Sequence, residues 1–272
     1  MRIALKVFVS DKCSLPVDVN TLLKMLAQYE INATFFVSPP KRSRWNPLSA
    51  NEKVFQAVVE SLLQQGHEVG AAPMDAAVWK ERILDMDRLE TEREVARAIK
   101  IFRDIGCSET IPWSSSGNRI NADVPLIQQR FDIRYASDTR GLTPFFPVTV
   151  AGRSSCVQIP TTLPLISELI GQGIAPDEIH QYLFMESQKP LNAGHVFVFE
   201  LDGSDVRLPL EVLEKIVVMW KGAHWEFSTL GEMYQRLDLN EVAEHEIGLH
   251  AVKGAADVMA VQGPRVIEPT EE

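Results

Sequence analysis

The chain has 272 residues, enough to bury a full core as one large α/β domain or two small ones. With 45% hydrophobic and 24% charged residues, its composition is that of an ordinary folded globular protein. The 37 acidic residues outnumber the 27 basic ones and give a formal charge of -10, which disfavours binding to nucleic-acid backbones and to anionic lipid headgroups.

Short β-branched and aromatic runs alternate with longer stretches of helical periodicity, a pattern typical of parallel strands joined by helices. The predicted strands are 3–9, 33–38, 68–71, 110–113, 133–137, 196–200 and 225–228. The predicted helices are 19–29, 52–65, 89–105, 122–131 and 210–221. About seven such units with no Gly-x-Gly-x-x-Gly turn favour a closed, barrel-like sheet over a dinucleotide-binding fold.

In a barrel of this kind, the loops that follow the C-terminal ends of the strands carry the chemistry. These loops begin near Ser10, Pro39, Ala72, Ser114, Asp138 and Glu200. The long, proline-bearing excursion from Gly141 to Gln158 is expected to cover one side of the barrel mouth. We expect one barrel domain over residues 1–239 and a partly disordered C-terminal extension over residues 240–272, with a frayed tail from Gly263 to Glu272.

The N-terminus and the cysteines indicate an intracellular protein. Residues 1–9 hold no long apolar segment with a small-residue cleavage site, so no secretory signal is expected. The longest uncharged run, 154–167, is too short and too polar to span a bilayer. Cys13, Cys107 and Cys156 are odd in number and lack Cys-x-x-Cys spacing, which predicts reduced cytosolic thiols.

Three segments carry motifs: INATFFV at 31–37, GHEVG at 66–70 and IRYASDTRG at 133–141. Together they resemble the polysaccharide deacetylase superfamily, the NodB-type carbohydrate esterases, and imply an irregular (β/α)7 barrel. The third segment and QIPTTLP at 158–164 resemble the branch that deformylates 4-formamido-arabinose carried on undecaprenyl phosphate. The resemblance spans residues 2–237. It implies a polyprenyl-phosphate-linked sugar or a protein as partner, and a cytoplasmic location, at most peripheral at the inner face of the membrane.

Amide hydrolysis in that superfamily uses a divalent metal held by one carboxylate and two imidazoles, with a second carboxylate as base and a further histidine as acid. By resemblance, the base and the metal carboxylate fall on Phe8 and Ser10, the imidazoles on Ala72 and Ala76, and the acid on Glu200. Methyl groups bind no metal. A carboxylic acid replaces the acid histidine only if its pKa is raised. The sequence therefore predicts a pseudoenzyme with no catalytic residue, metal or other cofactor.

Polar residues around the pocket persist. The residues predicted to bind a phosphorylated or lipid-linked amino sugar are Arg119, Asp138, Arg140, Gln158 and Thr162. Arg119 matches the arginine that steers the catalytic base in the superfamily, and both arginines can make forked bonds to a phosphate. An equally open interpretation is a structural network in which Arg119 and Arg140 pair with Asp138 or Glu200.

Two other functions compete with sugar binding by an inactive homologue. The protein could be an active, divergent deacetylase or deformylase in which Asp11, Asp75 and Glu200 hold a hard cation such as Mg²⁺ or Ca²⁺. It could instead be a purely structural subunit whose barrel mouth is filled by side chains, which an exposed apolar interface would indicate. The inactive homologue itself could, in place of binding a sugar, dock on a partner enzyme and regulate it. His67 begins its strand at the end away from the loops, so we interpret it as a structural hydrogen-bonding residue.

Overall fold

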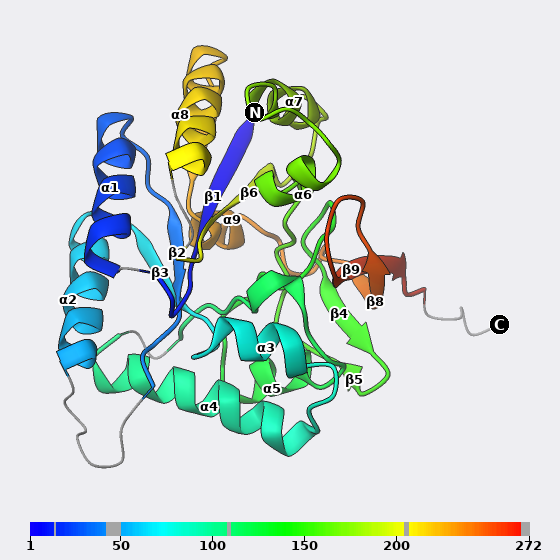
Figure 1. Ribbon diagram of the computed structural model, residues 1–272. Helices are drawn as coiled ribbons and strands as arrows, with labels where there is room; N and C mark the ends of the chain where they lie inside the picture. The colour runs from blue at the N-terminus through cyan, green and yellow to red at the C-terminus, as the bar shows by residue number, and fades with distance from the viewer. Residues whose placement is uncertain (14, 42–49, 108–109, 204–206, 268–272) are drawn as a thin grey trace.

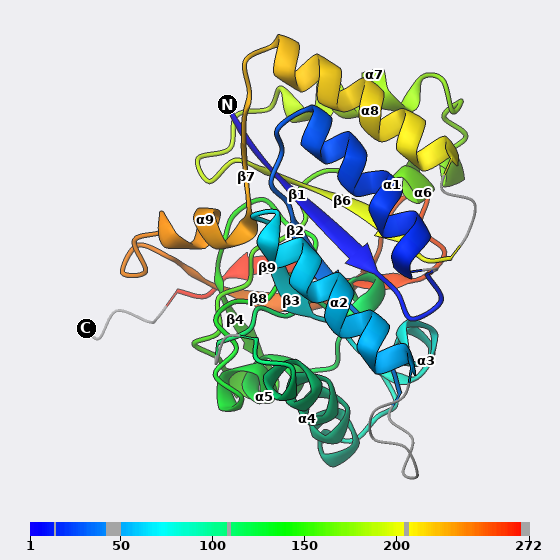
Figure 2. The same cartoon turned by 90° about the vertical axis from the view of Figure 1, so that its left-hand side faces the viewer.

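The computed structural model describes residues 1–13, 15–41, 50–107, 110–203 and 207–267. Its central sheet is parallel and runs in the order β3 (Glu68–Ala71), β2 (Thr34–Val37), β1 (Arg2–Val9), β6 (His195–Leu201), with β7 (Glu226–Ser228) pairing to the start of β1. Figures 1 and 2 show helices α1 (Leu15–Gln28), α2 (Ala50–Gln64) and α8 (Arg207–Gly222) along the outside of this sheet.

Beyond β3 the sheet continues through single bridges. Ala71 pairs with Trp113, Trp113 with Ala136, and Ala136 with Gln158, all in parallel. The chain then returns to β6, because the Thr162 N–H donates to the Val196 carbonyl at 3.2 Å. The predicted strands 110–113 and 133–137 are thus single bridges. Pro112 lacks an N–H and so cannot donate a hydrogen bond to a neighbouring strand, which limits strand pairing in the segment 110–113. The described residues form an irregular ring of strands and no continuous closed ladder.

The two faces of β1 contact two different apolar clusters, and one of these clusters lies inside the ring. Ile3, Leu5, Val7 and Val9 belong to the larger apolar cluster, packed with the outer helices. Ala4 and Phe8 belong to a second, interior cluster with side chains from the other strands, including Phe36, Tyr135, Val157 and Ile159. Burying each large side chain contributes roughly 1.5–3 kcal/mol. A parallel strand buried on both faces therefore has an almost continuous apolar sequence.

Helix α9 (Leu230–Gln235) closes the N-terminal end of the ring. Leu230 belongs to the interior cluster, and the Gly231 N–H donates to the Glu68 carboxylate at 2.7 Å. A Cβ on Gly231 would collide with that carboxylate, so a larger residue here would push the Glu68 side chain out of this contact. Near the same end, the His67 ring accepts the Ala33 N–H at 3.2 Å, which confirms its structural role. Ligand access is left to the opposite end.

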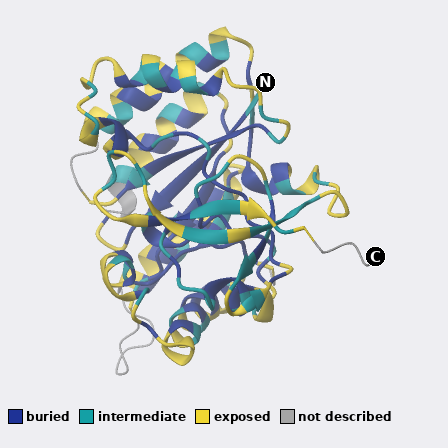
Figure 3. Ribbon diagram, turned by 90° about the vertical axis from the view of Figure 1, so that its right-hand side faces the viewer, coloured by how far each residue is buried: buried dark blue, intermediate teal, exposed yellow. Residues whose placement is uncertain are grey.

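A second sheet lies beside the ring, in the order β5 (Gly152–Arg153), β4 (Phe146–Thr149), β8 (Glu244–Ala251), β9 (Val258–Arg265). Figure 3 shows its half-buried and exposed strands against the buried ring. The excursion from Gly141 to Gln158 supplies β4 and β5. Pairing extends to Arg265, so the predicted frayed tail does not begin at Gly263, and residues 268–272 lie outside the described residues. The domain boundary after residue 239 stays a prediction.

The remaining helices are α3 (Ala76–Arg82), α4 (Arg88–Asp104), the short 3-10 helix η1 (Ser116–Asn118), α5 (Val124–Arg130), α6 (Ile166–Gly171) and α7 (Ile179–Ser187). The five predicted helices correspond to α1, α2, α4, α5 and α8. Helices α3, α6, α7 and α9, at most 9 residues long, are too short to show a clear period in the sequence. In the described part of the chain, no helix is both long and apolar enough to cross a membrane.

Candidate functional site

A small cavity, here called the mouth pocket, opens at the C-terminal ends of β1 and β6. Its volume is about 150 Å³, and its lining residues are Phe8, Ser10, Lys12, Ala76, Ala77, Lys80, Ser116, Glu200 and Asp202. Parallel pairing sets Phe8 beside Glu200 across the two strands. A cavity of this volume corresponds to about five water molecules at about 30 Å³ each, which is space for a small polar ligand or for part of a larger one. The pocket lies where a barrel of this kind carries its chemistry.

Two of the three positions that match the superfamily's metal ligands line this pocket. Ser10 and Ala76 line it, and Ala72 belongs with Ala76 to the interior apolar cluster. The Ser10 hydroxyl already accepts the Lys12 N–H at 3.2 Å. One neutral hydroxyl and two methyl groups do not fit a divalent transition metal, which needs a charged oxygen and imidazole nitrogens here.

Asp11 and Asp75, two of the carboxylates of the alternative metal site, already bind other groups of the protein. Asp11 accepts the Ala76 N–H at 3.1 Å. Asp75 caps α3 by accepting the Val78 N–H at 2.9 Å and binds Lys41 at 2.5 Å. Within the described residues, no three His, Cys, Asp or Glu side chains are grouped so that they could hold a metal ion. The arrangement therefore does not favour a carboxylate metal site.

Glu200 meets one condition of the family chemistry. Burial raises the pKa of its carboxyl, and neighbouring Asp202 acts in the same direction, while Lys80 and Lys6 oppose the rise. A carboxylic acid with a raised pKa can donate a proton. The position that matches the base is Phe8, however, so a hydrocarbon ring stands beside Glu200 where the family chemistry needs a base.

The sequence analysis missed Lys6, which lies inside the ring. Its side chain is 2% exposed, and its ammonium donates to the Ser137 carbonyl at 2.5 Å and lies 5.6 Å from the centre of the Phe36 ring. Burial lowers its pKa from 10.5 to about 8, opposed by the charges of Asp138 and Glu200. The sequence does carry a signal for Lys6: it lies two residues from both Ala4 and Phe8, on the inward face of an otherwise apolar strand.

Buried hydroxyl groups also face this interior. Tyr135 lies in the interior cluster, and Ser137 and Thr139 follow it at the two-residue period that keeps a side chain on one face of a strand. Among the described residues, the hydroxyls of Ser38, Ser137, Thr139 and Thr161 are buried without a hydrogen-bond partner. Buried polar groups are normally satisfied by protein, water or ligand. The interior of the ring around Lys6 is therefore polar.

Replacing Lys6 with methionine is expected to flatten the pH dependence of stability between pH 8 and pH 10.5. A lysine whose pKa falls on folding binds fewer protons in the folded than in the unfolded chain across this window, so stability rises with pH. The shift from 10.5 to about 8 corresponds to a rise of roughly 3 kcal/mol. Urea unfolding at several pH values measures it, with Lys53→Met on the exposed face of α2 as control. Equal slopes in both variants would contradict the assignment.

Two of the predicted ligand residues bind each other. Asp138 is fully buried, and its carboxylate accepts the Ser115 N–H at 2.5 Å and the Gln128 amide at 2.5 Å. The Gln158 side chain accepts the Asp138 N–H at 3.1 Å and donates to the same carboxylate at 3.4 Å. These bonds tie the strand segments to α5. The predicted role of Asp138 and Gln158 in ligand binding stays a prediction.

The other three predicted residues lie apart from the mouth pocket. Arg119 pairs with Asp257 at 3.1 Å. Arg140 donates to the Leu163 carbonyl and lies 3.4 Å from Glu168, and it lines a separate cavity of about 580 Å³ with Thr162. The proposed pairing of both arginines with Asp138 or Glu200 is therefore wrong. Both arginines form ion pairs within the chain, but with Asp257 and Glu168, neither of which was predicted as a partner.

Comparison with known proteins tests the resemblance. No family model matches the chain. It is 26% identical over 186 residues to the 4-deoxy-4-formamido-L-arabinose-phosphoundecaprenol deformylase ArnD of Shewanella sediminis, covering 67% of this chain and 58% of that protein. It is 23% identical over 154 residues to ArnD of Wigglesworthia glossinidia brevipalpis, covering 56% and 54%. The chain thus matches little more than half the length of these relatives.

Solved structures have the same fold. A polysaccharide deacetylase from Mycobacterium smegmatis has a TM-score of 0.65 at 13% identity, over 92% of this chain and 95% of that one. The resemblance of the chain to the NodB-type polysaccharide deacetylases is confirmed by its similarity in sequence to the ArnD deformylases and in fold to the solved deacetylases. The irregular barrel predicted from the sequence is thereby confirmed as a fold class, although its ladder is not continuous.

The superfamily includes an inactive member of similar fold. BA3943 of Bacillus anthracis, a CE4 family pseudoenzyme, has a TM-score of 0.56 at 13% identity, over 90% of this chain and 69% of that one. A mutant of BA3943 with restored enzymatic activity has a TM-score of 0.55 at 12% identity, over 86% of this chain and 67% of that one. At this level of identity, the similarity concerns the fold.

Proposed function

We propose that this protein is a catalytically inactive polysaccharide deacetylase homologue that binds a lipid-linked or phosphorylated amino sugar at its barrel mouth. The observation that carries the proposal is the mouth pocket itself. The pocket keeps its position at the strand ends, whereas Phe8, Ser10 and Ala76 supply neither base nor metal ligand. A protein that keeps the pocket of an enzyme but lacks its base and metal ligands can bind the ligand without hydrolysing it.

Several features support an amino sugar as the ligand. Hydroxyl groups of a sugar match the Ser10 and Ser116 hydroxyls, which line the mouth pocket. An ammonium group matches the Glu200 carboxylate, and Lys12 and Lys80 provide positive charge at the rim for a phosphate. The ArnD relatives are named for a formamido-arabinose on phosphoundecaprenol, a ligand of this chemistry.

A lipid-linked ligand would place the protein at a membrane. We propose a cytoplasmic protein with at most peripheral contact at the inner membrane face, and a partner enzyme that takes over the bound sugar or is regulated by it. The binding site and the partner role are compatible, since a sugar-bound and a sugar-free form can present different surfaces.

Calorimetric titration with 4-amino-4-deoxy-arabinose 1-phosphate tests the binding. We expect saturable binding to the metal-free protein and a ten- to hundredfold weaker affinity for Glu200→Gln, the loss of one charge-assisted bond. Glu241→Gln, an exposed carboxylate remote from the pocket, serves as control. No binding to the unaltered protein would overturn the proposal.

An activity assay separates this proposal from the divergent enzyme. The 4-formamido analogue of the same sugar phosphate is incubated with the protein and added Zn²⁺, Co²⁺, Mg²⁺ or Ca²⁺, and formate is measured. We expect no formate above the protein-free reaction, because Phe8 and Ser10 replace the base and the charged metal ligand of the family chemistry. Metal-dependent formate release that Glu200→Gln abolishes would overturn inactivity and establish the divergent hydrolase.

A further inference from the structure

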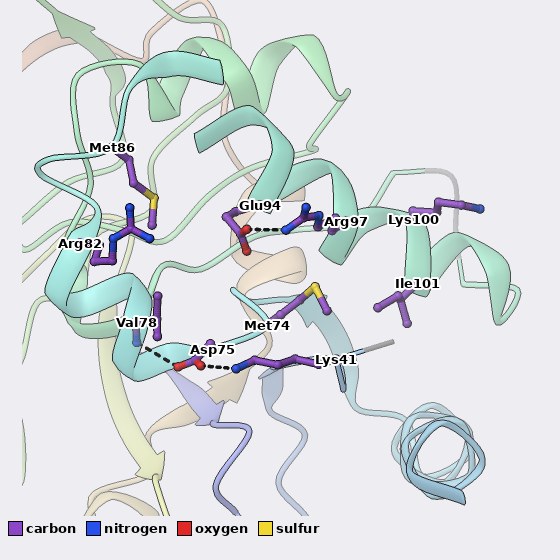
Figure 4. Close-up of a pocket in the computed structure, with 10 residues that line it drawn as sticks. All are labelled: Lys41, Met74, Asp75, Val78, Arg82, Met86, Glu94, Arg97, Lys100 and Ile101. Carbon is purple, nitrogen blue, oxygen red and sulfur yellow. Dashed lines mark hydrogen bonds and ion pairs between the residues drawn. The ribbon is translucent and has the colours of Figure 1, made fainter. Parts of the chain in front are cut away.

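The largest cavity among those described lies outside the mouth pocket, between α3 and α4 (Figure 4). Its volume is about 640 Å³. Its floor is apolar and buried, because Met74, Met86 and Ile101 are at most 9% exposed. We call this cavity the basic groove, since four cationic side chains line it: Lys41, Arg82, Arg97 and Lys100.

The charge of the basic groove is opposite to that of the whole chain. Among its described lining residues, two carboxylates, Asp75 and Glu94, accompany the four cations, whereas the chain carries a formal charge of -10. Figure 4 shows Asp75 bound to Lys41 and Glu94 bound to Arg97. A positive region of this kind attracts negatively charged groups to one place on an otherwise repulsive surface.

The four cations are accessible to an incoming ligand. Their side chains are 58–67% exposed. Arg82 lies 3.8 Å from its partner Glu90, and Lys100 pairs with Asp104, which does not line the groove. Ion pairs this exposed are weak, so the carboxylates of a ligand can replace them. The groove therefore suits a ligand that combines several carboxylates with an apolar part.

One segment of the chain itself has this composition. Residues 266–272, with the sequence VIEPTEE, begin with two apolar residues and hold three glutamates and no basic residue. The structure describes the first two of them, Val266 and Ile267, and Ile267 is 81% exposed. We call residues 266–272 the acidic segment. Its charge and its apolar start complement the rim and the floor of the basic groove.

The acidic segment starts away from the groove of its own molecule. Helix α3 lies near the start of β9, since the Trp79 indole donates to the Arg119 carbonyl at 2.8 Å and Arg119 pairs with Asp257 at 3.1 Å. From there β9 runs for 8 residues, about 25 Å, to Arg265. Figures 1 and 2 show the end of β9 apart from α3 and α4. Seven extended residues span at most about 25 Å and could return only to the start of β9, which leaves the groove of a second copy as their target.

We propose that the acidic segment of one copy of this protein binds in the basic groove of a second copy. Each molecule carries both the segment and the groove, so two copies can bind each other reciprocally and close as a dimer. The apolar start of the segment then covers the floor of the groove, and the glutamates pair with the cations of its rim. The dimer does not rest on the proposed sugar ligand, because the groove and the mouth pocket have no lining residue in common.

Analytical ultracentrifugation of the full chain measures the association. We expect a dimer whose fraction rises with protein concentration and falls in about 0.5 M NaCl, because salt screens the charge pairs. The triple glutamine variant, Glu268→Gln with Glu271→Gln and Glu272→Gln, should dimerise about tenfold more weakly or worse. Its matched control removes the same charge from three exposed glutamates on other elements: Glu30→Gln, Glu178→Gln and Glu211→Gln. An unaltered chain that stays monomeric at all concentrations, or equal weakening in both triple variants, would overturn the proposal.

A peptide with the sequence of residues 266–272, blocked at both ends, tests the groove directly by calorimetry. The receptor is the triple glutamine variant, whose own segments do not compete with the peptide. We expect the peptide to bind at least about tenfold more tightly than the same peptide with its three glutamates changed to glutamine, or with Ile267→Ser. Equal affinity of either altered peptide would overturn the match of charge and apolar floor on which the assignment rests.

Further changes in the receptor locate the site of peptide binding. We expect Arg82→Gln combined with Lys100→Gln to weaken it about tenfold or more. The matched control, Arg93→Gln combined with Lys215→Gln, removes two exposed cations of α4 and α8 that do not line the groove and should leave binding unchanged. Equal weakening by both pairs of changes would mean that the peptide responds only to the overall charge, and the assignment to the groove would be wrong.

A mixture of two variants tests whether segment and groove bind between copies. Val78→Glu puts a carboxylate into the groove at a 39% exposed position and keeps the segment, whereas the triple glutamine variant keeps the groove. At a concentration where the unaltered chain dimerises, we expect neither variant to dimerise alone and a heterodimer to form in their mixture. Val218→Glu on α8, a 50% exposed position, should dimerise like the unaltered chain. Dimers of Val78→Glu alone, or a mixture without heterodimer, would contradict the proposal even if the Arg82 and Lys100 variant misfolds.

Discussion

Arg140→Ala is expected to lower the free energy of unfolding by roughly 3–5 kcal/mol, the cost of leaving a buried charge without its partner. The Arg140 guanidinium lies 3.4 Å from Glu168, whose side chain is 2% exposed. Burial raises the pKa of the Glu168 carboxyl, and Arg140 opposes that rise. Without the arginine, the carboxylate is neutralised only by taking up a proton, so the loss of stability is greatest above neutral pH and shrinks as the pH falls.

Urea unfolding of two further variants checks this assignment. Glu168→Gln added to Arg140→Ala should recover most of the lost stability, since it removes the unpaired charge. Arg119→Ala should cost about 1 kcal/mol or less, because its partner Asp257 is 58% exposed. If Arg140→Ala instead keeps its stability and loses affinity for the sugar phosphate, Arg140 binds ligand and its contact with Glu168 is incidental.

The pairing of Arg140 shows which part of the site could not be predicted from the sequence. Strand 196–200 and helix 89–105 follow from local periodicity, which one segment carries by itself. The contact with Glu168 depends on α6, a helix of 6 residues, and on the loop that brings it under Arg140. Neither this short helix nor this loop shows a hydrophobic periodicity in the sequence. Asp138 was the nearest carboxylate in sequence, but its bonds to Ser115 and Gln128 engage it elsewhere.

For Lys6, by contrast, the sequence does contain a usable signal. A lysine between Leu5 and Val7, in a strand buried on both faces, contradicts the apolar pattern of parallel strands. Such a charge points to a polar interior. The hydroxyls at 137 and 139 repeat the signal on a second segment. The polar interior around Lys6 was therefore predictable from strand alternation. The cavity of about 640 Å³ between α3 and α4 was not, because two helices and the end of a loop build it.

The retained barrel also predicts that metal binding can be rebuilt. The triple variant Ser10→Asp, Ala72→His, Ala76→His is expected to bind one Zn²⁺ or Co²⁺ at micromolar affinity or better, about -8 kcal/mol, where the unaltered protein offers one hydroxyl. Ser10 and Ala76 already line one pocket, and Ala72 packs with Ala76, so the three new side chains converge. Metal analysis after dialysis and the visible spectrum of the Co²⁺ form measure the binding.

The rebuilt metal site should not hydrolyse the formamido sugar phosphate. The metal would polarise the carbonyl, but Phe8 still occupies the position of the base and can take no proton from the attacking water. The double variant without Ser10→Asp is the control, because two imidazoles alone should hold the metal more weakly. A folded triple variant that binds no metal would contradict the placement of the three positions around one pocket. Formate release by the triple variant would show that a residue other than Phe8, such as Glu200 with its raised pKa, acts as the base once a metal is present.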